Sequence, residues 1–139
     1  MDFAQASSRR PSLRTALVLD AAFEFVAGAA LLVFATTLGG WLHIGTLASA
    51  VAGVVFLVAG AFIASLLRTS RANSSVVRAL ALANTVGGCA GWIVAIAAWS
   101  SLDPAGRGVL GTASDLFLVI GVLELLALRD SADRRTNAE

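Results

Sequence analysis

Acidic and amide side chains stand inside the long apolar stretches of this chain. Asp20 and Glu24 are four residues apart, a spacing that places two side chains on one face of a helix. Asn84 and Glu124 stand in two further apolar stretches. Carboxyl and carboxamide groups form strong hydrogen bonds, and ionisable groups inside hydrocarbon mark functional sites by default. We therefore take these four residues as candidates for a buried polar network or for a proton or ligand site.

Residues for metal, haem or nucleophile chemistry are scarce. The chain has one histidine, one cysteine and one methionine, whereas a metal site or a haem within a bundle needs several such ligands. Cys89 has no second thiol and is interpreted as a packing residue. The sequence also lacks a Ser-His-Asp set, an HExxH motif and a glycine-rich phosphate loop. We predict no catalytic residue, no metal and no cofactor, and an enzyme is the less favoured interpretation.

The composition indicates which solvent surrounds these polar residues. Of the 139 residues, 58% are hydrophobic and 14% are charged, against about 25% charged residues in an ordinary soluble domain. So few charges cannot cover the surface of a soluble domain of this size, and the predicted solvent is a lipid bilayer. A net charge of +1 is too small to attract nucleic acid, and one cysteine excludes an internal disulfide.

Four stretches are long enough to cross a bilayer, whose core of about 30 Å requires about 20 mostly apolar residues per helix. Glycines and short polar segments separate them, and short links place consecutive helices antiparallel. The sequence therefore predicts an all-α, polytopic membrane four-helix bundle. Its expected parts are a cytoplasmic tail at 1–12, a four-helix domain at 13–128 with spans at about 13–37, 44–67, 76–99 and 109–128, and a cytoplasmic tail at 129–139.

The arginines predict the orientation of the bundle. Because positively charged flanks stay in the cytoplasm, we expect both termini on the cytoplasmic side of a bacterial inner membrane. Arg107 alone falls on the other side, where Trp41 and Trp99 fit the opposite interface. The first span is too long for a signal peptide and carries two acids, so we expect it to be retained. The arginines on the expected cytoplasmic side are Arg9, Arg10, Arg14, Arg68, Arg71, Arg78, Arg129, Arg134 and Arg135.

The two halves of the chain resemble each other. Residues 13–20 align with 77–84, and 56–60 align with 117–121. The pattern predicts two helical hairpins related as a parallel repeat about an axis along the membrane normal, with Asp20 and Asn84 as equivalent positions. The alternative is a chance similarity between helices rich in Ala, Leu, Val and Gly.

Small residues recur every four positions along the third span, at Ala83, Gly87, Gly91 and Ala95. Lipid offers no hydrophobic drive between helices, so helices associate through the close packing of small residues and through polar pairs. We expect this stripe to pack against another helix of the bundle. The alternative is a face for a homodimer.

The polar residues fall into two groups along the membrane normal. Asp20, Glu24, Asn84 and Glu124 share the half nearer the termini, where we expect at least one of the first two to be protonated at pH 7. Asp115 is nine residues from Glu124, which places it half a turn out of phase and about 13 Å away along the helix axis. We expect Asp115 to join His43 and Arg107 in a cluster at the opposite interface.

The chain resembles small bacterial membrane proteins of the DoxX-like kind. The features that carry the resemblance are the four short spans, the arginines on one side, the Leu19-Asp20-Ala21 segment and the stretch from Gly28 to Leu32. The resemblance covers about the whole membrane portion and rests on layout. It implies an accessory or redox-associated role in the membrane. The chain departs from any cofactor-bearing member of such families because no histidine lies in the middle of a span.

Three functions stay open at this point. The first is a non-enzymatic accessory or structural subunit with a buried polar network. The second is a small proton-coupled carrier, oligomeric or not, which requires water to reach the network. The third is a redox-associated subunit that binds a quinone near Trp92. The expected partners are the bilayer and a second copy or another membrane protein, and no nucleic acid. The sequence does not tell whether the protein has a small-molecule ligand.

Overall fold

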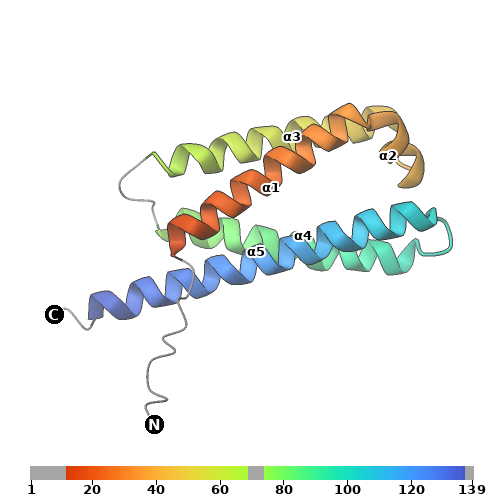
Figure 1. The fold of residues 1–139 in the computed structure, drawn as a ribbon. Coiled ribbons are helices and arrows are strands. Elements are labelled where there is room, and N and C mark those ends of the chain that lie inside the picture. Colours follow the sequence, from red (N-terminus) through yellow and green to blue (C-terminus); the bar gives the residue numbers. More distant parts are fainter. Residues whose placement is uncertain (1–11, 69–73, 137–139) are drawn as a thin grey trace, which may run out of the picture.

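The computed structural model describes residues 12–68 and 74–136, with side chains up to residue 130. The described residues form helices and no strands, so the predicted all-α fold is confirmed. Of the predicted tail at 1–12, residues 1–11 lie outside the described residues, as do 69–73 and 137–139. The helices are α1 (Leu13–Val33), α2 (Ala35–Trp41), α3 (Gly45–Leu66), α4 (Ser74–Ala97) and α5 (Pro104–Thr136), as Figure 1 shows.

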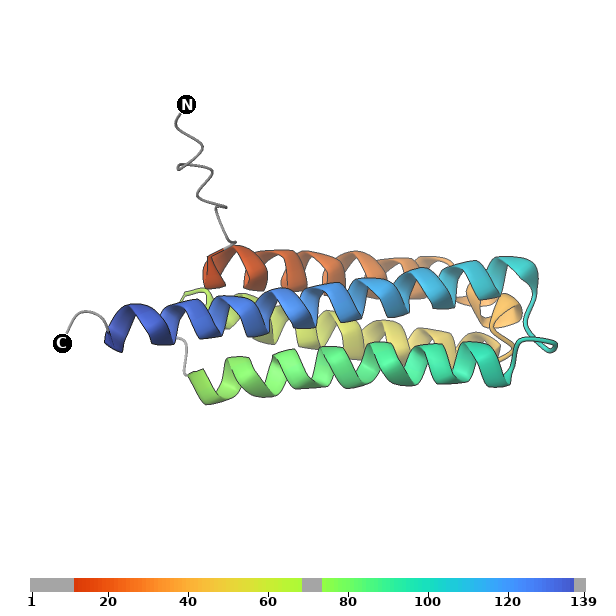
Figure 2. The same cartoon turned by 90° about the horizontal axis from the view of Figure 1, so that it is seen from below.

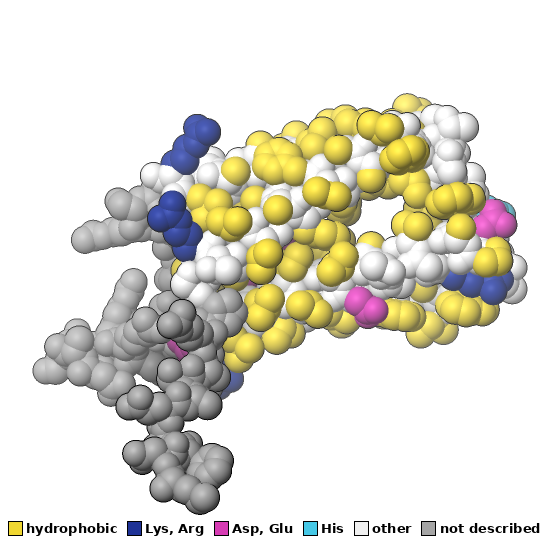
Figure 3. All heavy atoms as spheres, viewed as in Figure 1, with side chains coloured by type: hydrophobic (Ala, Val, Ile, Leu, Met, Phe, Trp, Pro, Cys, Tyr) yellow, Lys and Arg dark blue, Asp and Glu magenta, His cyan; other side chains and the backbone are white. Residues whose placement is uncertain are grey.

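Four of these helices are long and apolar enough to cross a membrane: α1, α3, α4 and the Pro104–Asp130 part of α5. They lie lengthwise beside one another (Figures 1 and 2). Many large hydrophobic side chains are exposed on the outside of the bundle, and Leu47 is 79% exposed. Figure 3 shows hydrophobic side chains spread over one face of the helices. Such a surface suits lipid, so the prediction of a multi-pass membrane protein is confirmed.

The two ends of the bundle differ, and we name them by what they carry. The terminal end holds the start of α1, the end of α3, the start of α4 and the C-terminal part of α5. The distal end holds α2 and the link from α4 to α5 (Figure 1). At the terminal end, the Thr15 N–H donates to Ser12 Oγ at 3.2 Å, which caps the first turn of α1.

The helix bounds differ from the predicted spans in three places. The first span is interrupted at Phe34, which separates α1 from α2. The last helix begins at Pro104. Proline suits the first turn of a helix because backbone N–H groups there have no partner within the helix, and because its φ is already helical. The last helix continues to Thr136, so helix extends into the segment that we expected to be a tail. Hydropathy marks the part of a helix that suits lipid and does not mark where the helix ends.

The helices pair into two tight hairpins. α1 packs along α3, and α4 packs along α5. The hairpins meet chiefly where α1 contacts α5, with a smaller contact between α2 and α5 at the distal end. Among the described residues, α3 and α4 share no close backbone contact. The contact within each hairpin is therefore much more extensive than the contact between them.

Glycines allow the backbones within each hairpin to approach closely. A Cβ atom on Gly28 would lie 2.8 Å from the Gly53 carbonyl oxygen and 2.9 Å from the Leu57 nitrogen. A Cβ atom on Gly88 would lie 2.7 Å from the Ser114 carbonyl oxygen and 3.0 Å from the Leu118 nitrogen. Neither position has room for a side chain.

These glycines also show the register of the repeat. Gly28 and Gly88 make matching contacts and are 60 residues apart, while Leu57 and Leu118, which they meet, are 61 apart. The same offset of 60 pairs Glu24 with Asn84. The predicted alignment of 13–20 with 77–84 paired Asp20 with Asn84 and is therefore displaced by one helical turn, whereas the predicted alignment of 56–60 with 117–121 has the observed offset of 61.

A second pair of contacts supports this register. A Cβ on Gly60 would lie 3.4 Å from the Ala21 carbonyl oxygen, and one on Gly121 would lie 2.8 Å from the Ala81 carbonyl oxygen. Ala21 and Ala81 are again 60 residues apart. The two hairpins thus pack through equivalent contacts, which is the arrangement expected of a duplicated hairpin.

The small residues of α4 do not all face α5. Gly91 packs against Ser114 and Ala95 is buried, but Ala83 is exposed and a Cβ on Gly87 would meet no atom within 4 Å. Asn84 turns toward the bundle interior. Gly88 and Gly91 stand four and seven positions after it and therefore share its face of the helix. Gly88 therefore makes the close approach that we expected of Gly87.

Replacing Gly88 by alanine tests the backbone contact within the second hairpin. The added Cβ meets Ser114 and Leu118, so we expect Gly88→Ala to lower the free energy of unfolding by about 1 to 3 kcal/mol. Gly87→Ala is the matched control, because its Cβ meets nothing and alanine favours helix by up to about 1 kcal/mol. Unfolding in mixed detergent followed by circular dichroism measures both. Equal stability of the two variants would contradict this packing.

Candidate functional site

The four candidate polar residues lie together in the half of the bundle nearer the terminal end. Asp20 and Glu24 come from α1, Asn84 from α4 and Glu124 from α5. All are buried, and Asp20 and Glu124 have exposed fractions of 0%. The Asn84 Nδ2 donates a hydrogen bond of 3.2 Å to Glu124 Oε2. We call these four residues the polar network.

Each member of the polar network lies on the stripe of its helix that faces inward. On α1, Asp20 and Glu24 share that stripe with Leu17 and Ala21. Leu17 and Ala21 also join Ile63 of α3 in an apolar cluster on the terminal side of the network. The same rotation that buries these apolar residues therefore buries both acids of α1.

Three carboxyl oxygens of the polar network have no hydrogen-bond partner among the described residues. Asp20 is close enough to Asn84 and Glu124 to interact with both. Its two oxygens nevertheless form no hydrogen bond of good geometry, and Glu124 Oε1 is also without a partner. A buried polar atom without a partner costs about 1 to 3 kcal/mol. The network is therefore closely assembled but incompletely hydrogen-bonded.

No cation neutralises these acids in the described part of the chain. Its arginines form no ion pair with Asp20, Glu24 or Glu124. Nor does any group of His, Cys, Asp and Glu within residues 12–68 and 74–130 have the arrangement of a metal site. An unpaired charge in an apolar interior is very costly. A proton held by the network is the group that would lower this cost.

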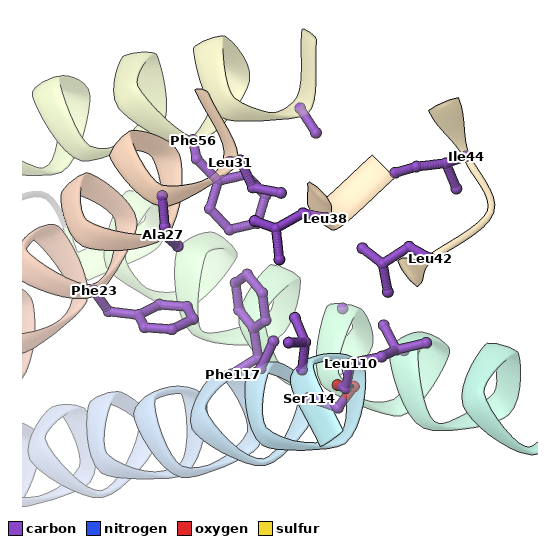
Figure 4. Close-up of a pocket in the computed structure, with 16 residues that line it drawn as sticks. Phe23, Ala27, Leu31, Leu38, Leu42, Ile44, Phe56, Leu110, Ser114 and Phe117 are labelled. Carbon is purple, nitrogen blue, oxygen red and sulfur yellow. Dashed lines mark hydrogen bonds between the residues drawn. The ribbon is translucent and has the colours of Figure 1, made fainter. Parts of the chain in front are cut away.

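A layer of phenylalanines lies on the distal side of the polar network. The ring of Phe117 meets that of Phe23 edge to face at 5.1 Å between centroids and meets that of Phe56 at 5.7 Å. These rings come from α5, α1 and α3, so both hairpins contribute to the layer (Figure 4). Edge-to-face contact is the favoured geometry of aromatic pairs. We call these three residues the aromatic layer.

Beyond the aromatic layer, the bundle contains a cavity of about 330 Å³. Apolar residues from both hairpins surround it, and the polar network does not line it (Figure 4). The lining residues are Phe23, Ala27, Ala30, Leu31, Leu38, Leu42, Ile44, Ala52, Phe56, Gly87, Gly91, Val109, Leu110, Ala113, Ser114 and Phe117.

The expected cluster of His43, Arg107 and Asp115 at the distal end is not formed. His43 Nε2 lies 3.7 Å from Asp103 Oδ2, and both side chains are more than half exposed. The Arg107 guanidinium lies over the Trp99 ring, 4.9 Å from its centroid, and its Nε donates to the Leu102 carbonyl at 3.1 Å.

Asp115 has a partner that spacing alone does not reveal. The Trp92 Nε1 of α4 donates to Asp115 Oδ1 at 2.9 Å. The Trp92 ring also lies beside Gly111, where a Cβ would be 3.5 Å from the ring. Trp92 therefore joins α4 to α5 and does not line the cavity. A quinone site at Trp92 stays a prediction.

Comparison with known proteins yields no relative from which a function can be transferred. No family model, no curated protein and no solved structure matches this chain. The DoxX-like resemblance is accordingly neither supported nor contradicted.

Proposed function

We propose that this multi-pass membrane protein is a non-enzymatic accessory or structural subunit whose two hairpins are joined by the polar network. The observation that carries the proposal is the burial of Asp20 of the first hairpin against Asn84 and Glu124 of the second. An accessory role also agrees with what the DoxX-like resemblance implies.

The need for such a network follows from the lipid solvent. Helices in lipid gain nothing from hydrophobic attraction to each other, and polar pairs across helices contribute about 0.6 kcal/mol on average and up to about 1.7. The hairpins meet through the limited contact of α1 with α5, so a polar interaction at this contact is a large part of their attraction. A proton on Asp20 or Glu124 would supply the donor that their unpartnered oxygens lack.

The proposed location is a bacterial inner membrane with both termini in the cytoplasm. The apolar exterior supports contact with lipid. Among the described arginines, Arg14, Arg68, Arg78 and Arg129 are exposed toward the terminal end, and Arg107 lies at the distal end. This asymmetry supports the orientation by the preference of positive charge for the cytoplasmic side. A second copy or another membrane protein remains the proposed partner.

A double-mutant cycle tests the attraction between the hairpins. We expect Asp20→Ala and Asn84→Ala to be coupled by about 0.6 to 1.7 kcal/mol in the free energy of unfolding, because each removes one side of the same contact. The control cycle combines Asp20→Ala with Thr85→Ala, since the Thr85 hydroxyl bonds to the Ala81 carbonyl of its own helix at 2.8 Å. Unfolding in mixed detergent measures both cycles. Equal coupling in the two would contradict the proposal.

Infrared spectroscopy tests the proposed proton. At pH 7 we expect the purified protein to show the carbonyl stretch of a protonated carboxyl, and we expect Asp20→Asn or Glu124→Gln to remove or shift that band. Asp103→Asn is the control, because this exposed acid lies outside the network and should leave the band unchanged. A spectrum in which every carboxyl is ionised at pH 7 would show that the network holds no proton.

A proton-coupled carrier is the second candidate. The three unpartnered oxygens of Asp20 and Glu124 favour it, because a purely structural network would be expected to satisfy them. Both residues are fully buried, so exchange of a proton with water requires a rearrangement that exposes them.

Reconstitution into liposomes tests the carrier. With a pH-sensitive dye inside the vesicles, a carrier that uses the network predicts proton flux in the wild type and a loss of flux in Asp20→Asn and Glu24→Gln. Asp115→Asn is the matched control, because Asp115 lies outside the network and bonds to Trp92. Equal flux in the wild type and all variants would eliminate the carrier and leave the structural proposal standing.

A further inference from the structure

The cavity beyond the aromatic layer exists because small residues face it. Alanines and glycines line it on α1, α3, α4 and α5, and the aromatic layer closes its terminal side (Figure 4). Its volume of about 330 Å³ exceeds that of an apolar protein cavity of about 150 Å³ that binds benzene. The small lining residues are Ala27, Ala30, Ala52, Gly87, Gly91 and Ala113.

We propose that this cavity binds one acyl chain of a membrane phospholipid. Ser114 is the one lining residue with a polar side chain, and its hydroxyl donates to the Leu110 carbonyl of its own helix at 2.7 Å. A quinone ring or another polar head would lose its hydrogen bonds to water here and gain few in return. A hydrocarbon chain loses none and gains dispersion contacts with the walls.

The cavity communicates with the side of the bundle. One neighbouring groove shares Phe23, Val109 and Ala113 with it, and another shares Ala30, Leu38 and Val109. Figure 3 shows the molecule hollowed between the hairpins toward the distal end. The helices around these openings are the apolar spans, so the surrounding medium is lipid tails. A chain can therefore enter sideways from the bilayer.

Charge at the distal end identifies the kind of lipid. Arg107 stands two residues before Val109, which lines the cavity and both grooves. Among the described arginines it alone lies at this end, stacked on Trp99. A phospholipid of the distal leaflet would place its phosphate at the level of this guanidinium while one chain descends into the cavity. The lipid site shares no residue with the polar network, so an experiment can contradict one of the two proposals without contradicting the other.

The experiment uses the full chain in liposomes that contain a phosphatidylglycerol with a diazirine at the end of one acyl chain. After illumination, peptide mass spectrometry locates the labels. We expect labels on inward residues such as Leu31 and Phe117 in addition to lipid-facing Val58, which is 64% exposed. Labels confined to lipid-facing residues would overturn the proposal.

Gly87→Leu is the variant that fills the cavity. A Cβ at Gly87 meets no atom within 4 Å, so the helix accommodates leucine, and its side chain occupies space that Gly87 lines. We expect a several-fold loss of label at Leu31 and Phe117 with the label at Val58 unchanged. Ala83→Leu is the matched control, one turn away on α4, exposed and outside the lining, and should label as the wild type.

A second variant and two competitors complete the labelling experiment. Ala113→Leu is a second filling variant if Gly87→Leu fails to give a helical protein. Excess unlabelled phosphatidylglycerol should abolish the inward label, whereas an isoprenoid quinone at the same concentration should not. Undiminished inward labelling in a folded filling variant, or selective competition by the quinone, would overturn the proposal of a phospholipid chain.

Discussion

Hydrocarbon as solvent is the constraint on which the whole arrangement depends. It supplies no attraction between helices and no partner for a polar group, so contact must come from the close fit of backbones and from polar side chains that meet inside the bundle. Gly28 and Gly88 provide the close fit within each hairpin. Asp20 and Asn84 provide polar contact between the hairpins. Polar contact also acts within the second hairpin, where Asn84 donates to Glu124.

The interior changes in character along the membrane normal. The polar network occupies the half nearer the terminal end, the aromatic layer follows it, and the cavity lies beyond. Phe23 and Glu24 are neighbours in the sequence, yet one contributes to the cavity wall and the other to the network. The phenylalanine rings keep an apolar space and an acidic one apart within a single bundle of helices.

Much of this fold follows from local properties of the sequence. The four apolar spans, and the acids and amide within them, depend on composition over about 20 residues, which a single chain reveals directly. The register between the first and third spans does not, because helices of Ala, Leu, Val and Gly align nearly as well one turn away. The inward position of Gly88 in place of Gly87 goes with the contact of Asn84 on α4 with Glu124 on α5, which joins segments distant in the sequence. The cavity depends on small residues from distant segments and could not be predicted from any one of them.

The unequal lengths of the helices bear on how the molecule sits in its membrane. At about 1.5 Å per residue, the 21 residues of α1 extend for about 32 Å, whereas the 27 apolar-span residues of α5 extend for about 40 Å. A bilayer core of about 30 Å matches the first and not the second, so α5 must tilt or project beyond the lipid. The helix also continues to Thr136, six residues past the end of its apolar span at Asp130.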